Sequence, residues 1–133
     1  MKATVTWWSH DEGPVEIHDA VELDRVVDMV IKSECSEYPT VVVVHANIYL
    51  LEIAVGLPES FVQIGPDSGL GPYLVAVFDR NADDNDTFNF YFQGLHHTEI
   101  RHRNILPSTL ARELARAFVV TGGIPKDIEW EAV

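Results

Sequence analysis

Four consecutive valines, Val41 to Val44, constrain the fold more than any other feature of the sequence. Branched side chains favour extended backbone, and successive side chains of a strand point to opposite faces. A run without polar interruption therefore predicts a strand that is covered on both faces. The chain has 133 residues, the size of one ordinary domain. We expect residues 1–133 to form a single domain around this strand.

Other segments predict further strands of one sheet. Their apolar residues alternate or run together over a few positions, and turn residues such as Asn47 separate them. The predicted strands are 3–8, 48–55, 61–64, 73–78 and 128–133, and 15–17 is predicted as a short extended entry to the first helix. Short connections between the central strands favour antiparallel pairing.

One more strand alternates cleanly after the polar segment 79–86. Phe88, Phe90 and Phe92 share one face, and the opposite face carries polar side chains and Tyr91. We interpret 79–86 as the turn of a hairpin in which this strand returns along 73–78. The phenylalanine face belongs to the core, and the other face reaches water or a partner.

Two amphipathic helices are predicted. Asp19 is a suitable N-cap for the first helix, and Glu22 completes a capping-box pattern before an apolar stripe. The second helix begins at Pro107 or Ser108 and ends at the pair Gly122-Gly123. The order of elements indicates an α+β fold: a mostly antiparallel sheet of about six to seven strands with both helices packed on one face.

Charge narrows the classes of partner. The 21 acidic and nine basic residues give a formal net charge of −12. Such a charge disfavours direct binding to nucleic acid or an anionic membrane and favours a basic partner. A single cysteine excludes an internal disulfide. The first residues lack a signal-peptide pattern, so we expect a cytoplasmic protein. We also expect it to be a monomer or a weak homodimer.

No catalytic pattern stands out. His96, His97 and Glu99 form the densest group of potential metal ligands, but neighbouring arginines would repel a cation and no established ligand spacing is present. We expect no catalytic residues, no metal and no cofactor. Two alternatives stay open: a small metal-dependent enzyme that uses these three residues, and a ligand-binding or self-associating domain.

Three segments together resemble a known family. They are 14–24, 69–75, and 118–125 continued by Glu129-Trp130. The most specific part is the closing helix with its Thr-Gly-x-x-Pro stop and the Glu-Trp strand. In this order and spacing they resemble the first immunity-protein family of bacterial polymorphic toxin systems, which is common in actinobacteria. The resemblance implies a non-enzymatic α+β protein, encoded beside a toxin gene, that binds and blocks a nucleic-acid deaminase or nuclease domain.

The acidic segment 79–86 is the candidate contact with such a toxin. A toxin that acts on nucleic acid commonly has a basic cleft, which an acidic inhibitor can occupy. We therefore hypothesise that Asp79, Asp83, Asp84 and Asp86 contact the toxin and that Tyr91 supplies an aromatic anchor. The alternative is a turn that is merely solvated.

Overall fold

A computed structural model describes residues 2–8, 11–35, 37–82, 85–92 and 96–133, with the side chain of His96 left out. Within these ranges the chain forms two α-helices, one 3₁₀ turn and a series of short strands. The elements are β1 (Ala3–Trp7), β2 (Val15–Ile17), α1 (Ala20–Glu34), β3 (Thr40–Ala46), β4 (Tyr49–Val55), β5 (Glu59–Ser60), β6 (Val62–Pro66), β7 (Leu74–Val77), β8 (Thr87–Phe92), β9 (His96–Arg101), η2 (His102–Asn104), β10 (Leu106–Pro107), α2 (Ser108–Thr121) and β11 (Glu129–Ala132).

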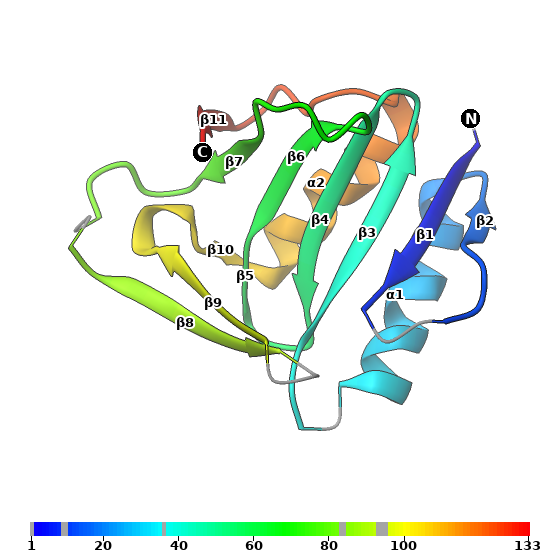
Figure 1. The fold of residues 1–133 in the computed structure, drawn as a ribbon, viewed down its shortest axis with the longest axis horizontal. Coiled ribbons are helices and arrows are strands. Elements are labelled where there is room, and N and C mark those ends of the chain that lie inside the picture. The colour runs from blue at the N-terminus through cyan, green and yellow to red at the C-terminus, as the bar shows by residue number, and fades with distance from the viewer. Residues whose placement is uncertain (1, 9–10, 36, 83–84, 93–95) are drawn as a thin grey trace.

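A seven-stranded antiparallel sheet organises the described chain. Its strand order is β11-β7-β6-β4-β3-β1-β2, so the first and last strands of the chain lie near opposite edges (Figure 1). Two further ladders, β5–β10 and β8–β9, stand apart from this sheet. Both helices lie behind the sheet in Figure 1. The predicted α+β fold is confirmed.

Local sequence signals determine where the helices begin and end. The Asp19 carboxylate accepts a hydrogen bond from the Glu22 amide at 2.8 Å, and the Glu22 carboxylate accepts one from the His18 amide at 3.0 Å. The first contact satisfies an amide that the first turn of α1 leaves unpaired, and the second ties the residue before the N-cap to the helix. At the end of α2, Gly122 adopts φ 69° and donates its amide to the Phe118 carbonyl. Only glycine takes this left-handed conformation without steric cost.

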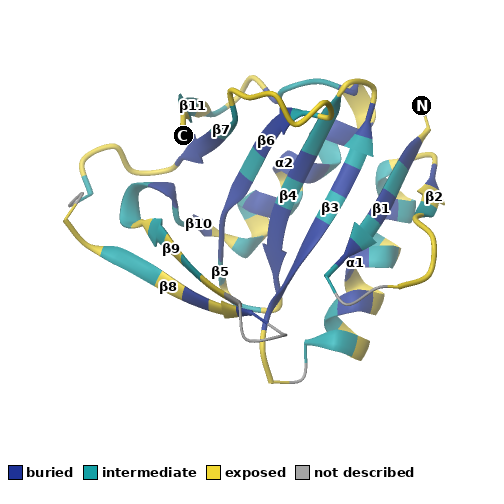
Figure 2. Ribbon diagram, in the orientation of Figure 1, coloured by how far each residue is buried: buried dark blue, intermediate teal, exposed yellow. Residues whose placement is uncertain are grey.

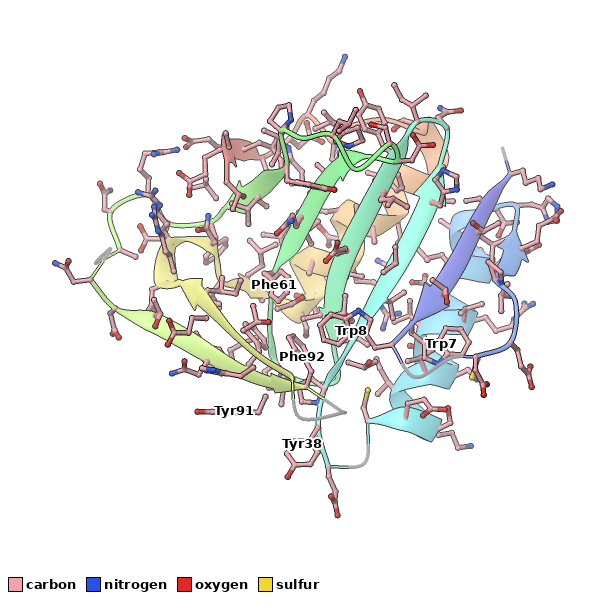
Figure 3. The ribbon with its side chains drawn as sticks, in the orientation of Figure 1. Trp7, Trp8, Tyr38, Phe61, Tyr91 and Phe92 are labelled. Carbon is pink, nitrogen blue, oxygen red and sulfur yellow. The ribbon has the colours of Figure 1, made fainter. Side chains whose placement is uncertain are left out.

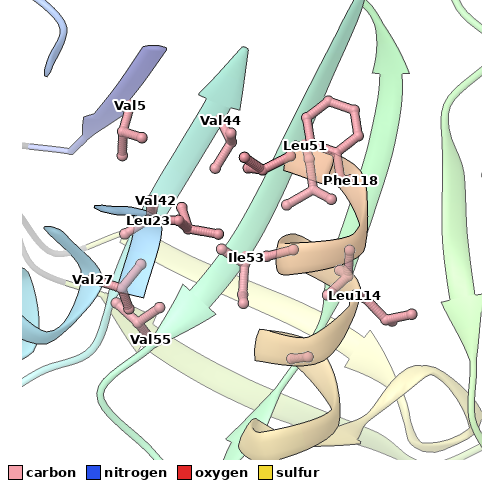
Figure 4. Packing of buried hydrophobic residues seen from close by; sticks show 14 of the residues in the cluster. Val5, Leu23, Val27, Val42, Val44, Leu51, Ile53, Val55, Leu114 and Phe118 are labelled. Atoms are coloured by element: carbon pink, nitrogen blue, oxygen red, sulfur yellow. The ribbon is translucent and has the colours of Figure 1, made fainter. Parts of the chain in front are cut away.

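The main core lies between the helices and one face of the sheet. Leu23 and Val27 of α1 and Phe118 of α2 pack against strand residues such as Val44 and Leu51 (Figure 4). Ala111 and Ala115 are fully buried, which lets α2 approach the sheet closely. The apolar stripes predicted for both helices therefore point into this core.

Ion pairs join the two helices at their outer side. The Asp24 carboxylate of α1 accepts hydrogen bonds from Arg116 at 2.8 Å and Arg112 at 3.2 Å, and Arg112 also reaches Asp28. Burial alone would raise the pKa of Asp24, but the two guanidinium groups outweigh it and hold that pKa below its ordinary value. The pairs fix the angle at which α1 and α2 meet.

The hairpin β8–β9 covers part of the opposite face. Phe90 and Phe92 are buried there against Val41, Ala54 and Phe61 (Figures 2 and 3). The Phe61 ring meets the Phe90 ring edge-on at a centroid distance of 5.2 Å. Val42 and Val44 face the helices and Val41 packs beneath the hairpin, so the predicted strand is covered on both sides at its start, whereas Val43 remains half-exposed.

The structure corrects the predicted partner of this phenylalanine strand. β8 pairs with β9, whereas β7 pairs with β6 and β11. The C-terminal strand β11 occupies the edge beside β7, so the strand after the acidic segment crosses to another layer and buries its aromatic face there. Segment 79–86 is therefore a connection between two sheets and not the turn of a hairpin.

No helix in the described part of the chain has the length and apolar character needed to cross a membrane.

Candidate functional site

The outward face of the β8–β9 hairpin presents an ordered aromatic and polar surface. Tyr91 and His97 are cross-strand neighbours whose rings stack at a centroid distance of 4.8 Å. The His97 Nε2 atom lies 2.9 Å from the Asn89 side-chain oxygen. Tyr91 nevertheless remains 58% exposed. The phenylalanines beneath hold this pair rigidly, so Tyr91 meets the basic requirement for an anchor: a large, positioned and accessible ring.

The histidine cluster is only partly assembled. His97 and Glu99 lie on the same exposed face of β9, but His97 is engaged by Asn89 and Tyr91. Among the described side chains no group of three or more His, Cys, Asp and Glu residues could hold a metal ion. The side chain of His96 lies outside this description.

The two ends of the acidic segment are anchored on η2. The Arg103 carbonyl accepts hydrogen bonds from the amides of Phe78, at 2.8 Å, and Asp79. At the other end, the Asp86 carbonyl accepts a hydrogen bond from the His102 amide. The Asp86 carboxylate also lies 3.3 Å from His102 Nε2. These bonds hold the ends of segment 79–86 together and leave Asp79 and Asp86 exposed.

The structure places the predicted contact residues in two groups. Asp79 and Asp86 flank the connection, and the Asp79 side chain accepts a hydrogen bond from the Asn81 amide. Asp83 and Asp84 lie outside the described residues. Tyr91 is five residues beyond Asp86 on β8, a separation of roughly 17 Å along an extended strand. A partner must therefore span the hairpin to contact both groups.

An ion-pair network ties the connection to the edge of the main sheet. The Glu131 carboxylate accepts hydrogen bonds from Arg103 and Asn104, each at 2.9 Å, while Arg80 forms an ion pair with Glu129. Burial alone would raise the pKa of Glu131, but these hydrogen bonds and arginine charges keep it below its ordinary value. Arg80 is thus directed towards β11.

A second candidate binding surface was not predicted from the sequence. The hairpin covers only part of the sheet face opposite the helices, and on β1, β3, β4, β6 and at Tyr73 eight described side chains of this face remain half-exposed. We call these residues the open face: Thr4, Thr6, Val43, His45, Leu50, Glu52, Gln63 and Tyr73. Their alternation with core residues is visible in the sequence, but which residues of this face are covered depends on where the hairpin docks.

A hollow of about 220 Å³ joins the open face to the hairpin. Its lining includes Gln63 and Val75 from the sheet and Glu99 and Arg101 from β9. Glu131 also lines this hollow and is occupied by Arg103 and Asn104. The outward face of the hairpin and the open face therefore meet at this hollow.

The helix side of the molecule is a weaker candidate for a functional site. A hollow of about 630 Å³ lies between α2 and the end of β4, and its two basic side chains, Arg112 and Arg116, are already held by Asp24. Cys35 is half-buried nearby, and burial together with the Glu34 charge raises the pKa of its thiol. A reactive thiolate is thereby disfavoured.

Comparison with known proteins identifies the family. The sequence profile described as Immunity protein Imm1 matches residues 11–132, which include every element from β2 to β11. No curated protein matches the chain. The profile spans both the helix-covered sheet and the aromatic hairpin, and it confirms the resemblance seen in the sequence. The chain belongs to the Imm1 family of immunity proteins.

Proposed function

We propose that this protein binds and neutralises the toxin domain of a polymorphic toxin system, a nucleic-acid deaminase or nuclease, by blocking its active site. Membership of the immunity-protein family is the observation that carries the proposal. The protein acts as a non-enzymatic, cytoplasmic inhibitor, and residues 1–133 form one binding domain. It meets the toxin as a monomer or weak homodimer.

Electrostatics supports this mode of action. A deaminase or nuclease needs positive charge to hold a phosphate backbone, and the immunity protein carries a net charge of −12. Opposite charges accelerate encounter and make the association rate depend on salt. The acidic segment enters the basic cleft of the toxin and takes the place of nucleic-acid phosphates.

Within this proposal, Asp79, Asp83, Asp84 and Asp86 supply charge, and Tyr91 supplies the anchor. The two described carboxylates are exposed at the ends of an anchored connection, and Tyr91 is exposed above a rigid aromatic layer. Such a combination of one buried aromatic contact and several peripheral charges is common in tight interfaces.

The test uses the toxin domain encoded beside the gene, made inactive by substitution. Binding is measured by calorimetry at low and high salt, and inhibition is measured with the active domain. The variant with Asp83, Asp84 and Asp86 replaced by alanine should bind at least tenfold more weakly. The control replaces Asp11, Glu12 and Asp127, which are exposed in other loops, and should bind like the wild type.

Each outcome has a distinct meaning. Failure of the wild-type protein to bind or inhibit the toxin domain contradicts the proposed function. Equal loss in the variant and in its control shows that only total charge matters, and it excludes the acidic segment as a specific contact.

A further inference from the structure

Glu52 is a charged side chain at the centre of the open face. It lies on β4 opposite Val43 of β3 and Gln63 of β6, so its carboxylate points away from the helices. β4 is the middle strand of the seven-stranded sheet. The row continues to Thr6 on β1 and Val75 on β7. An acidic residue in this position is surrounded on both sides by sheet.

The hairpin does not extend over the row of cross-strand neighbours that contains Glu52. Phe90 and Phe92 cover the row that contains Val41 and Ala54, two residues along each strand from Val43 and Glu52. Glu52 is therefore shielded from part of the solvent without being covered. This burial raises the pKa of Glu52 above its ordinary value, because it disfavours the charged form.

No described side chain compensates this charge. Among the described residues, none forms an ion pair with the Glu52 carboxylate or donates a side-chain hydrogen bond to it. His45, on the same face, is bound to Asp67 at 3.0 Å. Arg103, in the network beyond Val75, is bound to Glu131 at 2.9 Å. Arg101 of β9 lines the hollow beside Gln63 and Val75 but forms no ion pair with Glu52. A half-buried carboxylate without a partner is costly for the free protein.

The chemistry around Glu52 suits one kind of occupant. Val43 and Leu50 offer apolar surface to a methylene stem, while Glu52 and Gln63 offer oxygen acceptors to its head group. Lysine and arginine combine such a stem with a cationic head. The net charge of −12 attracts a basic partner to this surface.

We propose that Glu52 receives one lysine or arginine side chain of the toxin domain, which packs on the open face beside the β8–β9 hairpin. This inference rests on the proposed function and adds to it a specific contact on a surface separate from the acidic segment. The inserted cation pairs with Glu52 and removes the cost of leaving its carboxylate uncompensated.

The experiment compares Glu52→Gln with Glu113→Gln in binding to the inactive toxin domain. Both substitutions remove one negative charge and keep the shape of the side chain, but Glu113 is exposed on α2, on the helix side. Glu52→Gln should weaken binding at least tenfold, and Glu113→Gln should change it less than twofold. Because glutamine needs no counter-charge, Glu52→Gln should fold at least as stably as the wild type, and thermal unfolding checks this.

The outcomes separate the two proposals. If the wild type binds and Glu52→Gln binds equally well, the Glu52 contact is wrong and the proposed function stands. If both substitutions weaken binding equally, the effect is one of total charge and the contact is again wrong. If the wild type neither binds nor inhibits the toxin domain, both proposals fail.

Discussion

Replacing Phe90 by alanine should destabilise the protein more than any change on the exposed side of the hairpin. Phe90 is 0% exposed, and its ring contacts Phe61, Phe88 and Phe92 at centroid distances of 5.2, 4.7 and 5.5 Å. Loss of a buried phenylalanine typically costs about 3–5 kcal/mol, and the cost is highest where the surroundings cannot collapse. The ladder of the main sheet fixes one wall of this site, so we expect the upper part of that range.

Tyr91→Ala is the matched control, because Tyr91 is the next residue and points to the opposite face of β8. Its loss should cost less than about 1 kcal/mol, as is usual for exposed positions. Urea unfolding followed by tryptophan fluorescence measures both variants, since Trp8 contacts Phe92 at 5.1 Å. If the alanine variant does not fold, Phe90→Leu provides a smaller perturbation at the same site. A cost for Phe90→Ala below about 1 kcal/mol, or equal to that of Tyr91→Ala, would refute the aromatic layer as part of the core.

Three further predictions concern the rest of the molecule. Glu52→Gln should raise the melting temperature at neutral pH, because a raised folded-state pKa costs stability above that pKa; the difference should vanish below the ordinary glutamate pKa of 4.5. Asp24→Asn should lose about 1–2 kcal/mol at neutral pH, since Asp24 joins α1 to Arg116, and its lowered pKa means that this difference shrinks as the pH falls from 3.8 towards the lower folded-state pKa. Thermal unfolding from pH 3 to 8 tests both, and parallel wild-type and variant curves would contradict them. Gly65→Ala should cost about 1–3 kcal/mol by urea unfolding, because a Cβ there would overlap the Tyr73 ring, and unchanged stability would contradict that packing.

The sequence contained most of the local structure. The valine run, the Asp19 cap and the Gly122 stop each act through neighbouring backbone and side chains, and each was predicted correctly. The alternating face of Phe88, Phe90 and Phe92 was also recognised as a core face. These signals are readable because their physical causes lie within a few residues along the chain.

The pairing of β8 could not be read in the same way. A strand that follows a polar segment is normally expected to return along its predecessor, but β11 from the far end of the chain occupies that edge of β7. No feature within residues 79–92 indicates that β11, and not β8, pairs with β7. The open face depends on the same long-range choice, because the position of the hairpin determines that Ala54 is buried and Glu52 is not.

For the candidate contact residues, too, local features were predictable from the sequence and long-range ones were not. The exposure of Tyr91 follows from strand alternation and was predictable. Its stacking on His97 needed the β8–β9 register, which the sequence did not specify. Glu52 is the only charged residue of β4, but the positions of His45 and Arg103, which leave it without an ion-pair partner among the described residues, arise only in three dimensions.

The central claim is that the toxin domain binds the side of the sheet opposite the helices. Carbodiimide labelling of carboxyl groups, read by mass spectrometry with and without the inactive toxin domain, tests it most directly. The account predicts reduced labelling of Asp79, Asp86 and Glu99 in the complex, with Glu113 on α2 and Asp127 beyond it unchanged. Protection of Glu113 and Asp127 with unchanged labelling of the other three would contradict it.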